Sequence, residues 1–282
     1  MMDAIKHWLK TDLNTDIAQT EPLSGGDICD TARITTTDGR DLCIKQQTTA
    51  PADFFLAEAA GLEALRSTGT LRVPEVITAQ PTFIALEYIA PGRPGPTYWR
   101  NLGEGLAAQH RQPAPHFGFT MDNYCGRTPQ PNPATTNGHR FFAEHRLMYQ
   151  GRLAEAAGLL SSRELRDLET LCGKLPERIP EQAPALIHGD LWGGNIHCDQ
   201  AGHPVLIDPA VHWGWPEAEL AMTRLFGGFS DDFYDHYTQI NPPESGWRER
   251  VPLYNLYHLL NHLNLFGGGY HSQVIQIVRR YT

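Results

Sequence analysis

Three polar side chains in the second half of the chain have the types and the spacing that phosphoryl transfer from a nucleoside triphosphate requires. Asp190 precedes Asn195 by five residues, and Asp208 follows an apolar run at residues 205–207. In such a transfer one carboxylate accepts the proton of the attacking hydroxyl, while an amide oxygen and a second carboxylate hold magnesium on the phosphates. Protein kinases space these roles similarly, as H-R-D-x-x-x-x-N followed by D-F-G. We therefore predict Asp190 as the catalytic base and Asn195 and Asp208 as magnesium ligands, the alternative being a glycine-rich loop in which Asp190 merely caps a turn.

Lys45 and Glu58 are candidates for the pair that binds the phosphates in such a site. The chain has four lysines, and Lys45 stands alone between residues 11 and 173, at the end of a strand-like segment. Glu58 follows thirteen residues later on an expected helix. In kinases a lysine at this place contacts the α- and β-phosphates and is held by a glutamate of the next helix. A solvated charge at a strand edge is the alternative for Lys45.

Two further segments are candidates for nucleotide binding. Gly25 and Gly26 form a turn between the first two expected strands, where a kinase folds its glycine-rich loop over the phosphates. The third glycine of G-x-G-x-x-G is missing, so this signal is weak and an ordinary turn is the alternative. Glu87, Tyr88 and Ile89 end the fifth expected strand, where a kinase backbone hydrogen-bonds the adenine edge. An ordinary strand end would look the same.

Trp192 and His188 stand on either side of Asp190. Trp192 lies on a tight polar loop flanked by glycines, where a tryptophan is a poor core residue. We expect it to stack on the apolar face of a sugar ring, although it could instead pad the lobe behind the loop. We expect His188 to hydrogen-bond the loop backbone rather than to act as the base, because an aspartate suffices when the proton leaves late in a loose transition state.

Composition argues against several other classes of function. The net charge of −9 and the lack of a basic stripe argue against a nucleic-acid partner. The sequence contains no run of eighteen apolar residues, the length needed to span a membrane. The N-terminus also lacks the apolar core of a signal peptide, so we expect a cytoplasmic protein. Five cysteines without a C-x-x-C pair fit a reducing compartment. Neither G-x-S-x-G nor H-E-x-x-H occurs, which removes the commonest hydrolase pattern and a zinc pattern.

Hydrophobic periodicity and turn residues predict an α+β, two-lobed, protein-kinase-like fold. An N-terminal nucleotide-binding lobe at residues 1–90 should hold a five-stranded antiparallel sheet and one main helix at residues 54–67, capped by Asp53. A linker rich in Pro and Gly at residues 91–96 leads to a mostly helical lobe at residues 97–282. Residues 112–138 should form an irregular stretch, and loops of such length are usually functional or disordered. We expect residues 113–138 of this stretch to border the acceptor site. We further expect strands at residues 31–36, 41–45, 76–79, 82–88, 195–198 and 204–207, and helices at residues 3–10, 98–111, 139–158, 162–175, 217–226, 231–239, 248–266 and 272–281.

One eight-residue segment connects these observations to a known family. Residues 188–195 read H-G-D-L-W-G-G-N, which resembles the H-G-D-L-W-x-G-N signature of fructosamine kinases, also called ketosamine-3-kinases. This family belongs to a larger group that includes aminoglycoside phosphotransferases and choline kinase, and that group keeps H-G-D and the asparagine but not the tryptophan. The resemblance extends over nearly the whole chain, at residues 117–132, 141–144, 208–210, 219–222, 225–229, 261–262 and 266–270.

The resemblance implies an enzyme that uses ATP and Mg²⁺ to phosphorylate the 3-hydroxyl of a ketosamine, a sugar such as that of fructosamine or ribulosamine linked through an amine. In this family the phosphorylated adduct falls apart and frees the amine, which amounts to repair of glycated small amines or proteins. Position by position, it implies the roles already suggested by the residues, with Trp192 as the sugar-stacking residue. We expect a monomer or a weak homodimer, with neither nucleic acid nor membrane as a partner.

Two alternative functions and one departure stay open at this point. An aminoglycoside or choline phosphotransferase would call for an acidic pocket for its cationic substrate, which Trp192 in place of a polar residue does not favour. A pseudokinase that only binds nucleotide would usually lack a metal or phosphate residue, whereas all are present here. Some family members carry a redox-sensitive cysteine in the glycine-rich loop, but Cys29 is displaced from that position, which puts a disulfide switch in doubt.

Overall fold

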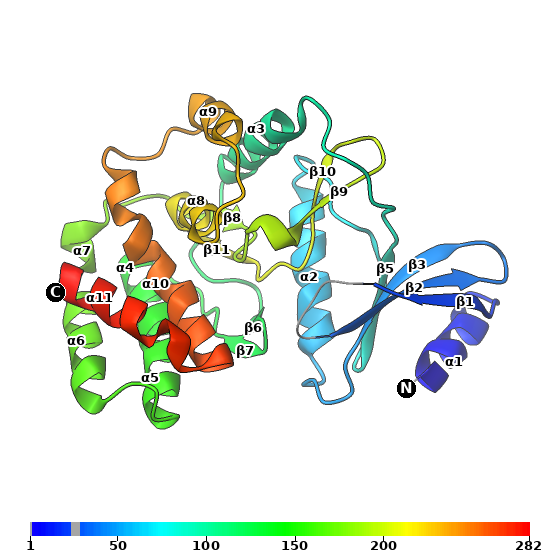
Figure 1. Ribbon diagram of the computed structural model, residues 1–282, viewed down its shortest axis with the longest axis horizontal. Helices are drawn as coiled ribbons and strands as arrows, with labels where there is room; N and C mark the ends of the chain where they lie inside the picture. Colours follow the sequence, from blue (N-terminus) through cyan, green and yellow to red (C-terminus); the bar gives the residue numbers. More distant parts are fainter. Residues whose placement is uncertain (1, 24–28) are drawn as a thin grey trace.

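A five-stranded antiparallel sheet forms the N-terminal part of the molecule (Figure 1). The computed structural model describes residues 2–23 and 29–282. The strand order is β1-β2-β3-β5-β4, so the predicted sheet is confirmed, with ends that shift by a residue or two. The strands are β1 Ile17–Pro22, β2 Asp30–Thr36, β3 Asp41–Gln46, β4 Val76–Gln80 and β5 Phe83–Glu87.

One helix covers each face of this sheet, and the alternation along the strands sorts side chains between them. α1 (Met2–Asp12) packs in one apolar cluster with Ile44, whereas α2 (Phe54–Ser67) packs in another with Ile84. Successive residues of a strand point to opposite faces. Lys45, the neighbour of Ile44 on β3, therefore lies on the side of α2, the helix that carries the predicted glutamate partner.

α2 begins at the predicted residue, but the side chain of Asp53 before it does not act as predicted. Asp53 precedes the helix, but its side chain makes no capping hydrogen bond. It accepts a hydrogen bond of 2.8 Å from the hydroxyl of Tyr124 instead. Asp53 thus occupies the predicted N-cap position, but the prediction was wrong for its side chain, because the carboxylate binds a hydroxyl from a distant segment.

The C-terminal part is mostly helical, as predicted, and much of its core surrounds the twenty-residue helix α10. α4 and α5 run into each other through a π-helical turn at Ala143–Leu147. No helix within residues 2–23 and 29–282 is long and apolar enough to cross a membrane. The helices are α3 Tyr98–His110, α4 Gly138–Phe142, α5 Met148–Ala156, α6 Ser162–Gly173, α7 Leu175–Arg178, α8 Pro216–Leu225, α9 Asp231–Ile240, α10 Trp247–Phe266 and α11 His271–Tyr281.

Short strand pairs between these helices carry the loops of the site. The pair β9–β10 was predicted, whereas β6–β7 and β8–β11 were not. β6 and β7 lie within the stretch predicted as irregular, so that prediction was wrong for this part of it. Strands of three residues are too short to show a readable alternation. The pairs are β6 Asn123–Cys125 with β7 Thr128–Gln130, β8 Ala185–Ile187 with β11 His212–Gly214, and β9 Ile196–Cys198 with β10 Pro204–Leu206.

The predicted linker at residues 91–96 lies against the turn between β9 and β10. The backbone N–H of Gly92 donates to the carbonyl oxygen of Cys198 at 2.8 Å. A Cβ on Gly92 would lie 2.0 Å from the carbonyl oxygen of Asp199, so this close approach requires glycine. The predicted boundaries between the N-terminal lobe, the linker and the C-terminal lobe stay predictions.

Candidate active site

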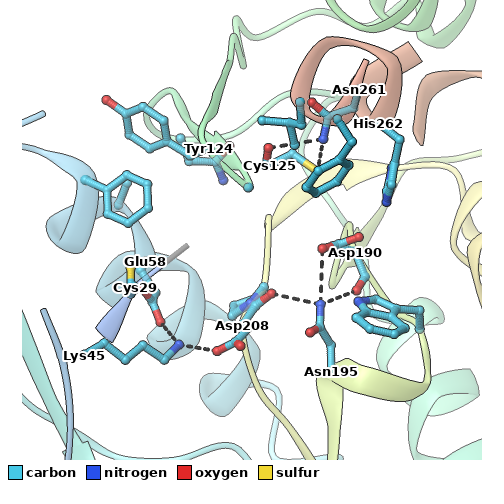
Figure 2. A pocket seen from close by; sticks show the side chains of 18 of the residues that line it. Cys29, Lys45, Glu58, Tyr124, Cys125, Asp190, Asn195, Asp208, Asn261 and His262 are labelled. Carbon is cyan, nitrogen blue, oxygen red and sulfur yellow. Dashed lines mark hydrogen bonds and ion pairs between the residues drawn. The ribbon is translucent and has the colours of Figure 1, made fainter. Parts of the chain in front are cut away.

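Lys45 and Glu58 meet between β3 and α2, as their positions in the sequence predict (Figure 2). The ammonium of Lys45 forms ion pairs with the carboxylates of both Glu58 and Asp208. The side chains of Lys45 and Glu58 are each 12% exposed, so solvent screens their attraction little. Burial alone would lower the pKa of Lys45, but Asp208 and Glu58 outweigh it and raise the pKa above its ordinary value. The ammonium therefore stays charged at neutral pH.

The loop that carries Asp190 owes its shape to a glycine and a buried histidine. Gly189 has a φ of 82°, and a Cβ there would lie 2.1 Å from the carbonyl oxygen of Ala210. Nδ1 of His188 accepts a hydrogen bond of 3.3 Å from the backbone N–H of Asp190. Its Nε2 then carries the proton and donates to the carbonyl oxygen of Ile207 at 2.8 Å. The prediction that His188 holds the loop backbone is confirmed.

A buried pair that was not predicted, Glu219 of α8 and His110 of α3, supports this loop. Oε1 of Glu219 accepts from the backbone N–H of Gly189 at 2.8 Å, and Oε2 accepts from Nε2 of His110 at 2.9 Å. Both side chains are completely buried. Burial alone would raise the pKa of Glu219, but the hydrogen bond from His110 is the first of several that outweigh it and lower the pKa. Glu219 therefore holds the loop as an ionised carboxylate, which accepts stronger hydrogen bonds than a neutral group does.

Asp190, Asn195 and Asp208 come together as predicted. Nδ2 of Asn195 donates to Oδ2 of Asp190 at 3.2 Å and to the carbonyl oxygen of Asp208 at 3.4 Å. Asp208 has a φ of 56°, a left-handed conformation that is uncommon outside glycine. Strained backbone of this kind is often found at functional sites. The geometry therefore places two carboxylates and one amide within reach of a single ligand.

The surroundings of Asp190 suit a proton acceptor. Burial raises the pKa of this carboxyl to about 7, against the hydrogen bond from Asn195, and the charges of Asp208 and Glu219 add to the rise. The side chain still keeps 22% of its surface exposed. A carboxylate with such a pKa is a stronger base than an ordinary aspartate and is still partly ionised at neutral pH.

A cavity of about 470 Å³ opens over these groups, a size that suits a small-molecule site. Trp192 lines it, is 38% exposed and packs edge to face on Phe226, with ring centres 5.7 Å apart. Further aromatic rings line the cavity beside Trp192. The ring of Phe226 contacts that of His262, which in turn contacts the rings of Phe266 and Tyr270. The cavity thus joins a charged region around Lys45 to an aromatic wall. This wall, named the Trp192 wall, comprises Trp192, Phe226, His262, Phe266 and Tyr270.

The β6–β7 hairpin supplies another part of the lining, so a segment of the stretch predicted to border the acceptor site does reach the cavity. Two buried amides fasten the hairpin to the chain that follows Asp208. Nδ2 of Asn123 donates to the carbonyl oxygen of Val211 at 2.7 Å, and Nε2 of Gln130 donates to that of Ala210 at 3.1 Å. The hairpin and the Asp208 segment are therefore positioned together.

Other residues predicted to bind the nucleotide stay predictions, namely Gly25, Gly26, Glu87, Tyr88 and Ile89. The two glycines lie outside the described residues, and the other three are not among the described residues that line the cavity. The carboxylate of Glu87 accepts a hydrogen bond of 2.7 Å from Arg72. The carbonyl oxygen of Ile89 accepts one of 2.9 Å from His197.

Cys29 lines the same cavity. Burial raises the pKa of its thiol to about 11, and Sγ donates to Oε1 of Gln47 at 3.7 Å. The thiolate is the form that reacts in disulfide exchange. The structure therefore strengthens the doubt about a redox switch at this residue.

Comparison with known proteins shows the family to which the chain belongs. The model of the fructosamine kinase family matches the whole chain, residues 1–282. The chain belongs to this family. It is 45% identical over 234 residues to a probable ketoamine kinase of Synechocystis sp. PCC 6803, with 80% of this chain and 78% of the other covered. It is 35% identical over 292 residues to the chloroplastic protein-ribulosamine 3-kinase of Oryza sativa subsp. japonica, with 99% and 83% covered.

A solved structure supports the same conclusion. A provisionally named fructosamine-3-kinase from Thermobifida fusca superimposes with a TM-score of 0.89 at 33% identity, and 98% of each chain is covered. The predicted family resemblance and the α+β kinase-like fold are thereby confirmed. Since the family is one of kinases, this family member is an ATP-dependent phosphotransferase.

Proposed function

We propose that this family member is a ketosamine-3-kinase, which transfers the γ-phosphate of ATP to the 3-hydroxyl of a fructosamine- or ribulosamine-type adduct. The single observation that carries the proposal is the convergence of Lys45, Asp190, Asn195 and Asp208 on one cavity that also holds Trp192. The first four residue types are those that phosphoryl transfer needs. The fifth is the one that distinguishes the family signature within its larger group.

The charged region of the cavity would hold the triphosphate. Lys45 would contact the α- and β-phosphates, and Glu58 would keep the ammonium in place. Asp208 and Asn195 offer the hard oxygen ligands that Mg²⁺ prefers, since the amide nitrogen of Asn195 is directed to Asp190 and leaves its oxygen for the ion. These residues therefore fit the ion, which when bound would offset the charge of the phosphates.

Asp190 would act as the base in the transfer. The ketosamine hydroxyl oxygen forms a bond to the γ-phosphorus while the bond from that phosphorus to the β,γ-bridging oxygen breaks. The hydroxyl proton passes to the carboxylate of Asp190, and ADP leaves with the electron pair of the broken bond. The hydrogen bond from Asn195 and the loop contacts of His188 and Glu219 hold the carboxylate ready for this step.

The Trp192 wall would bind the sugar and the start of the amine substituent. Rings of tryptophan and phenylalanine stack on the apolar faces of sugars, and aromatic faces attract a protonated amine. Among the described residues that line the cavity, the carboxylates are Glu58, Asp190 and Asp208, all of them in the charged region. A polycationic aminoglycoside therefore finds few partners here, whereas choline, a single cation, remains a fair competitor on physical grounds.

A substrate panel tests the proposal directly. The protein would be given Mg-ATP with fructosamine and ribulosamine adducts of lysine, with choline and with kanamycin, and ADP formation would be measured. We expect turnover of at least one ketosamine to exceed that of choline and kanamycin by at least about 100-fold, a difference that a site built to hydrogen-bond its substrate can reach. Phosphorus NMR of the product should place the phosphate on the 3-hydroxyl, and free amine should follow. Turnover of choline or kanamycin alone would contradict the proposal.

A further inference from the structure

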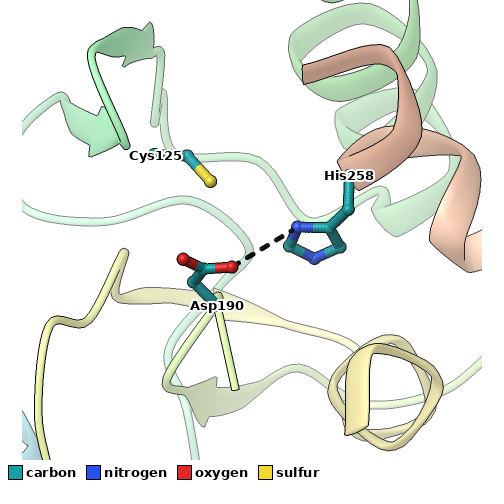
Figure 3. Close-up of side chains that lie close together, drawn as sticks. All are labelled: Cys125, Asp190 and His258. Carbon is teal, nitrogen blue, oxygen red and sulfur yellow. Dashed lines mark ion pairs between the residues drawn. The ribbon is translucent and has the colours of Figure 1, made fainter. Parts of the chain in front are cut away.

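Two side chains from distant parts of the chain, Cys125 and His258, lie beside Asp190 (Figure 3). Cys125 comes from β6 and His258 from α10, and the ligand atoms of these two and of Asp190 all lie within 4.8 Å of one another. Oδ1 of Asp190 lies 3.8 Å from Nδ1 of His258, whereas Oδ2 accepts the hydrogen bond from Asn195. The two carboxylate oxygens of Asp190 therefore face different residues, Oδ1 facing His258 and Oδ2 facing Asn195.

Nδ1 of His258 is a buried polar atom that could bind a ligand. The side chain of this residue is 7% exposed, and its Nδ1 has no hydrogen-bond partner among residues 2–23 and 29–282. Leaving a buried polar atom unpaired costs about 1–3 kcal/mol, so such atoms are rare in folded proteins. A neutral imidazole nitrogen with a free lone pair is also the commonest protein ligand for transition metals.

Cys125 places a sulfur opposite this nitrogen. The residue is 2% exposed, and its Sγ accepts a hydrogen bond of 3.3 Å from Nδ2 of Asn261. Oδ1 of Asn261 in turn accepts from Gln150 at 3.2 Å, which fixes the amide so that its N–H faces the sulfur. Hydrogen bonds of this kind to a coordinating atom are typical of the groups that surround metal ligands.

We propose that Cys125, Asp190 and His258 form a binding site for a thiophilic divalent cation such as Zn²⁺, and that occupation of this site switches the kinase off. Sγ, Oδ1 and Nδ1 would be the protein ligands. A water from the cavity would complete the tetrahedral set that zinc prefers. Mg²⁺ would not compete, because it favours hard oxygen ligands over sulfur and imidazole.

The geometry and the charge of the cluster suit this ion. Zinc bonds to sulfur, nitrogen and oxygen imply separations of about 3.3 to 3.6 Å between ligand atoms, so movements of about 1 Å would close the site. Cys125 would release its thiol proton to solvent on binding, and the thiolate together with the carboxylate of Asp190 would neutralise the two positive charges. Cys125 and Asp190 line the cavity, which gives the ion a route of entry, while His258 lies behind them.

Inhibition follows from the use of Asp190 as a ligand. A carboxylate that is bound to zinc cannot accept the proton of a substrate hydroxyl at the same time. This half of the inference rests on the proposed function, in which Asp190 is the base. The binding half rests on the cluster alone, so the two halves can fail separately.

Metal titration of the full-length, nucleotide-free protein tests the site. After chelator treatment, Co²⁺ would be added as a spectroscopic probe and Zn²⁺ affinity would be measured by calorimetry. We expect a single equivalent to bind, with a thiolate-to-cobalt absorption band. Cys125→Ser should abolish the band, and Cys125→Ser and His258→Gln should each weaken Zn²⁺ binding by at least about tenfold. The matched controls are Cys29→Ser and His262→Gln, a thiol and an imidazole that line the same cavity outside the cluster, and these should bind Zn²⁺ like the wild type.

Kinase assays on the same proteins test the switch. Zn²⁺ should inhibit the wild type in excess Mg²⁺ and should inhibit Cys125→Ser much less. A wild type that binds no Zn²⁺, or a Cys29→Ser variant that loses as much affinity as Cys125→Ser, would overturn the site. Tight binding without inhibition would keep the site and overturn the switch. If His258→Gln does not fold, as circular dichroism would reveal, Cys125→Ser, which is nearly isosteric with the wild type, and the smaller Cys125→Ala still decide the outcome.

Discussion

Lys45, which is proposed to bind phosphate, also forms ion pairs with two carboxylates. Its ammonium lies between the carboxylates of Glu58 on α2 and Asp208 after β10, so it neutralises two acidic groups that would otherwise repel each other. Removing one partner of a buried ion pair costs more than the pair itself contributes, because the remaining charge is left without compensation. The residue proposed to bind phosphate is therefore also expected to matter for folding.

Lys45→Met should lower both turnover and stability. We expect the free energy of unfolding to fall by roughly 2–4 kcal/mol, somewhat less than for a fully buried pair because Asp208 is partly exposed. Adding Glu58→Gln should restore part of this stability without restoring turnover, since it removes one of the two repelling charges. Urea denaturation and an ATP-turnover assay on the single and double variants measure both effects. A double variant less stable than Lys45→Met would contradict the repulsion that we infer.

Cys29 should react slowly with alkylating agents near neutral pH. Burial raises the pKa of its thiol to about 11, so the reactive thiolate is scarce there and increases as pH rises toward that value. The alkylation rate should therefore rise about tenfold per pH unit in the alkaline range below the pKa. Mass spectrometry of the peptide that contains Cys29, with free cysteine in the same mixture, measures the rate. A rate that already levels off near neutral pH would revive the redox switch.

At the scale of elements, α8 connects the loop of Asp190 to the helices around it. Glu219 joins the loop to α3 through Gly189 and His110. Two residues earlier in the same helix, Glu217 accepts from the guanidinium of Arg250 at 2.8 Å and from the hydroxyl of Tyr254 at 2.8 Å, both on α10. α8 thus connects the loop of Asp190 to both α3 and α10.

Glu219→Gln should loosen the loop and remove a pH-dependent contribution to stability. The pKa of Glu219 is below its usual value, so its stabilising effect is complete above about pH 4.5 and is lost as pH falls through the lowered pKa. We expect the variant to lose about 3 kcal/mol at neutral pH, and the difference from wild type should shrink in acid. Turnover should fall while the affinity for ATP changes little. Urea unfolding curves at neutral and acidic pH check this, and a difference that grows in acid would contradict the assigned ionisation.

Long periodic elements could be predicted from the sequence, whereas short ones and distant pairs could not. α2 was placed at its true bounds because fourteen residues show a clear apolar periodicity. β6 and β11 have three residues each, and only their partners reveal them. The local pattern around Asp53 predicts a helix cap, but its carboxylate accepts a hydrogen bond from Tyr124, which lies 71 residues away.

At the scale of the whole molecule, the site is a meeting point of segments far apart in the chain. Asp190 and Asn195 were found because their spacing is local and matches kinase chemistry. Lys45 was found because it is isolated among few lysines, although its partner Asp208 lies 163 residues away. No local pattern reveals that Glu219 pairs with His110 across 109 residues, or that Cys125 faces His258. The parts missed are thus those created by tertiary packing.

Nucleotide binding should stabilise the molecule as a whole, because its proposed contacts come from both parts. At 100 times its dissociation constant, a ligand that binds only the folded state adds about 2.7 kcal/mol. A non-hydrolysable ATP analogue with Mg²⁺ should therefore raise the melting temperature of the wild type, and chelation of the metal should reduce the rise. Lys45→Met should show little shift. An equal shift in wild type and variant, measured by differential scanning fluorimetry, would place the nucleotide elsewhere.

The central claim is that Asp190 is the base of a kinase that acts on ketosamines, and Asp190→Asn tests it most directly. Turnover of a ketosamine that the wild type phosphorylates should be compared with the affinity for Mg-ATP and with the melting temperature of both proteins. We predict that turnover falls by about 10²- to 10⁴-fold while nucleotide affinity and folding are kept. A folded Asp190→Asn protein that phosphorylates the ketosamine at the rate of the wild type would contradict the claim.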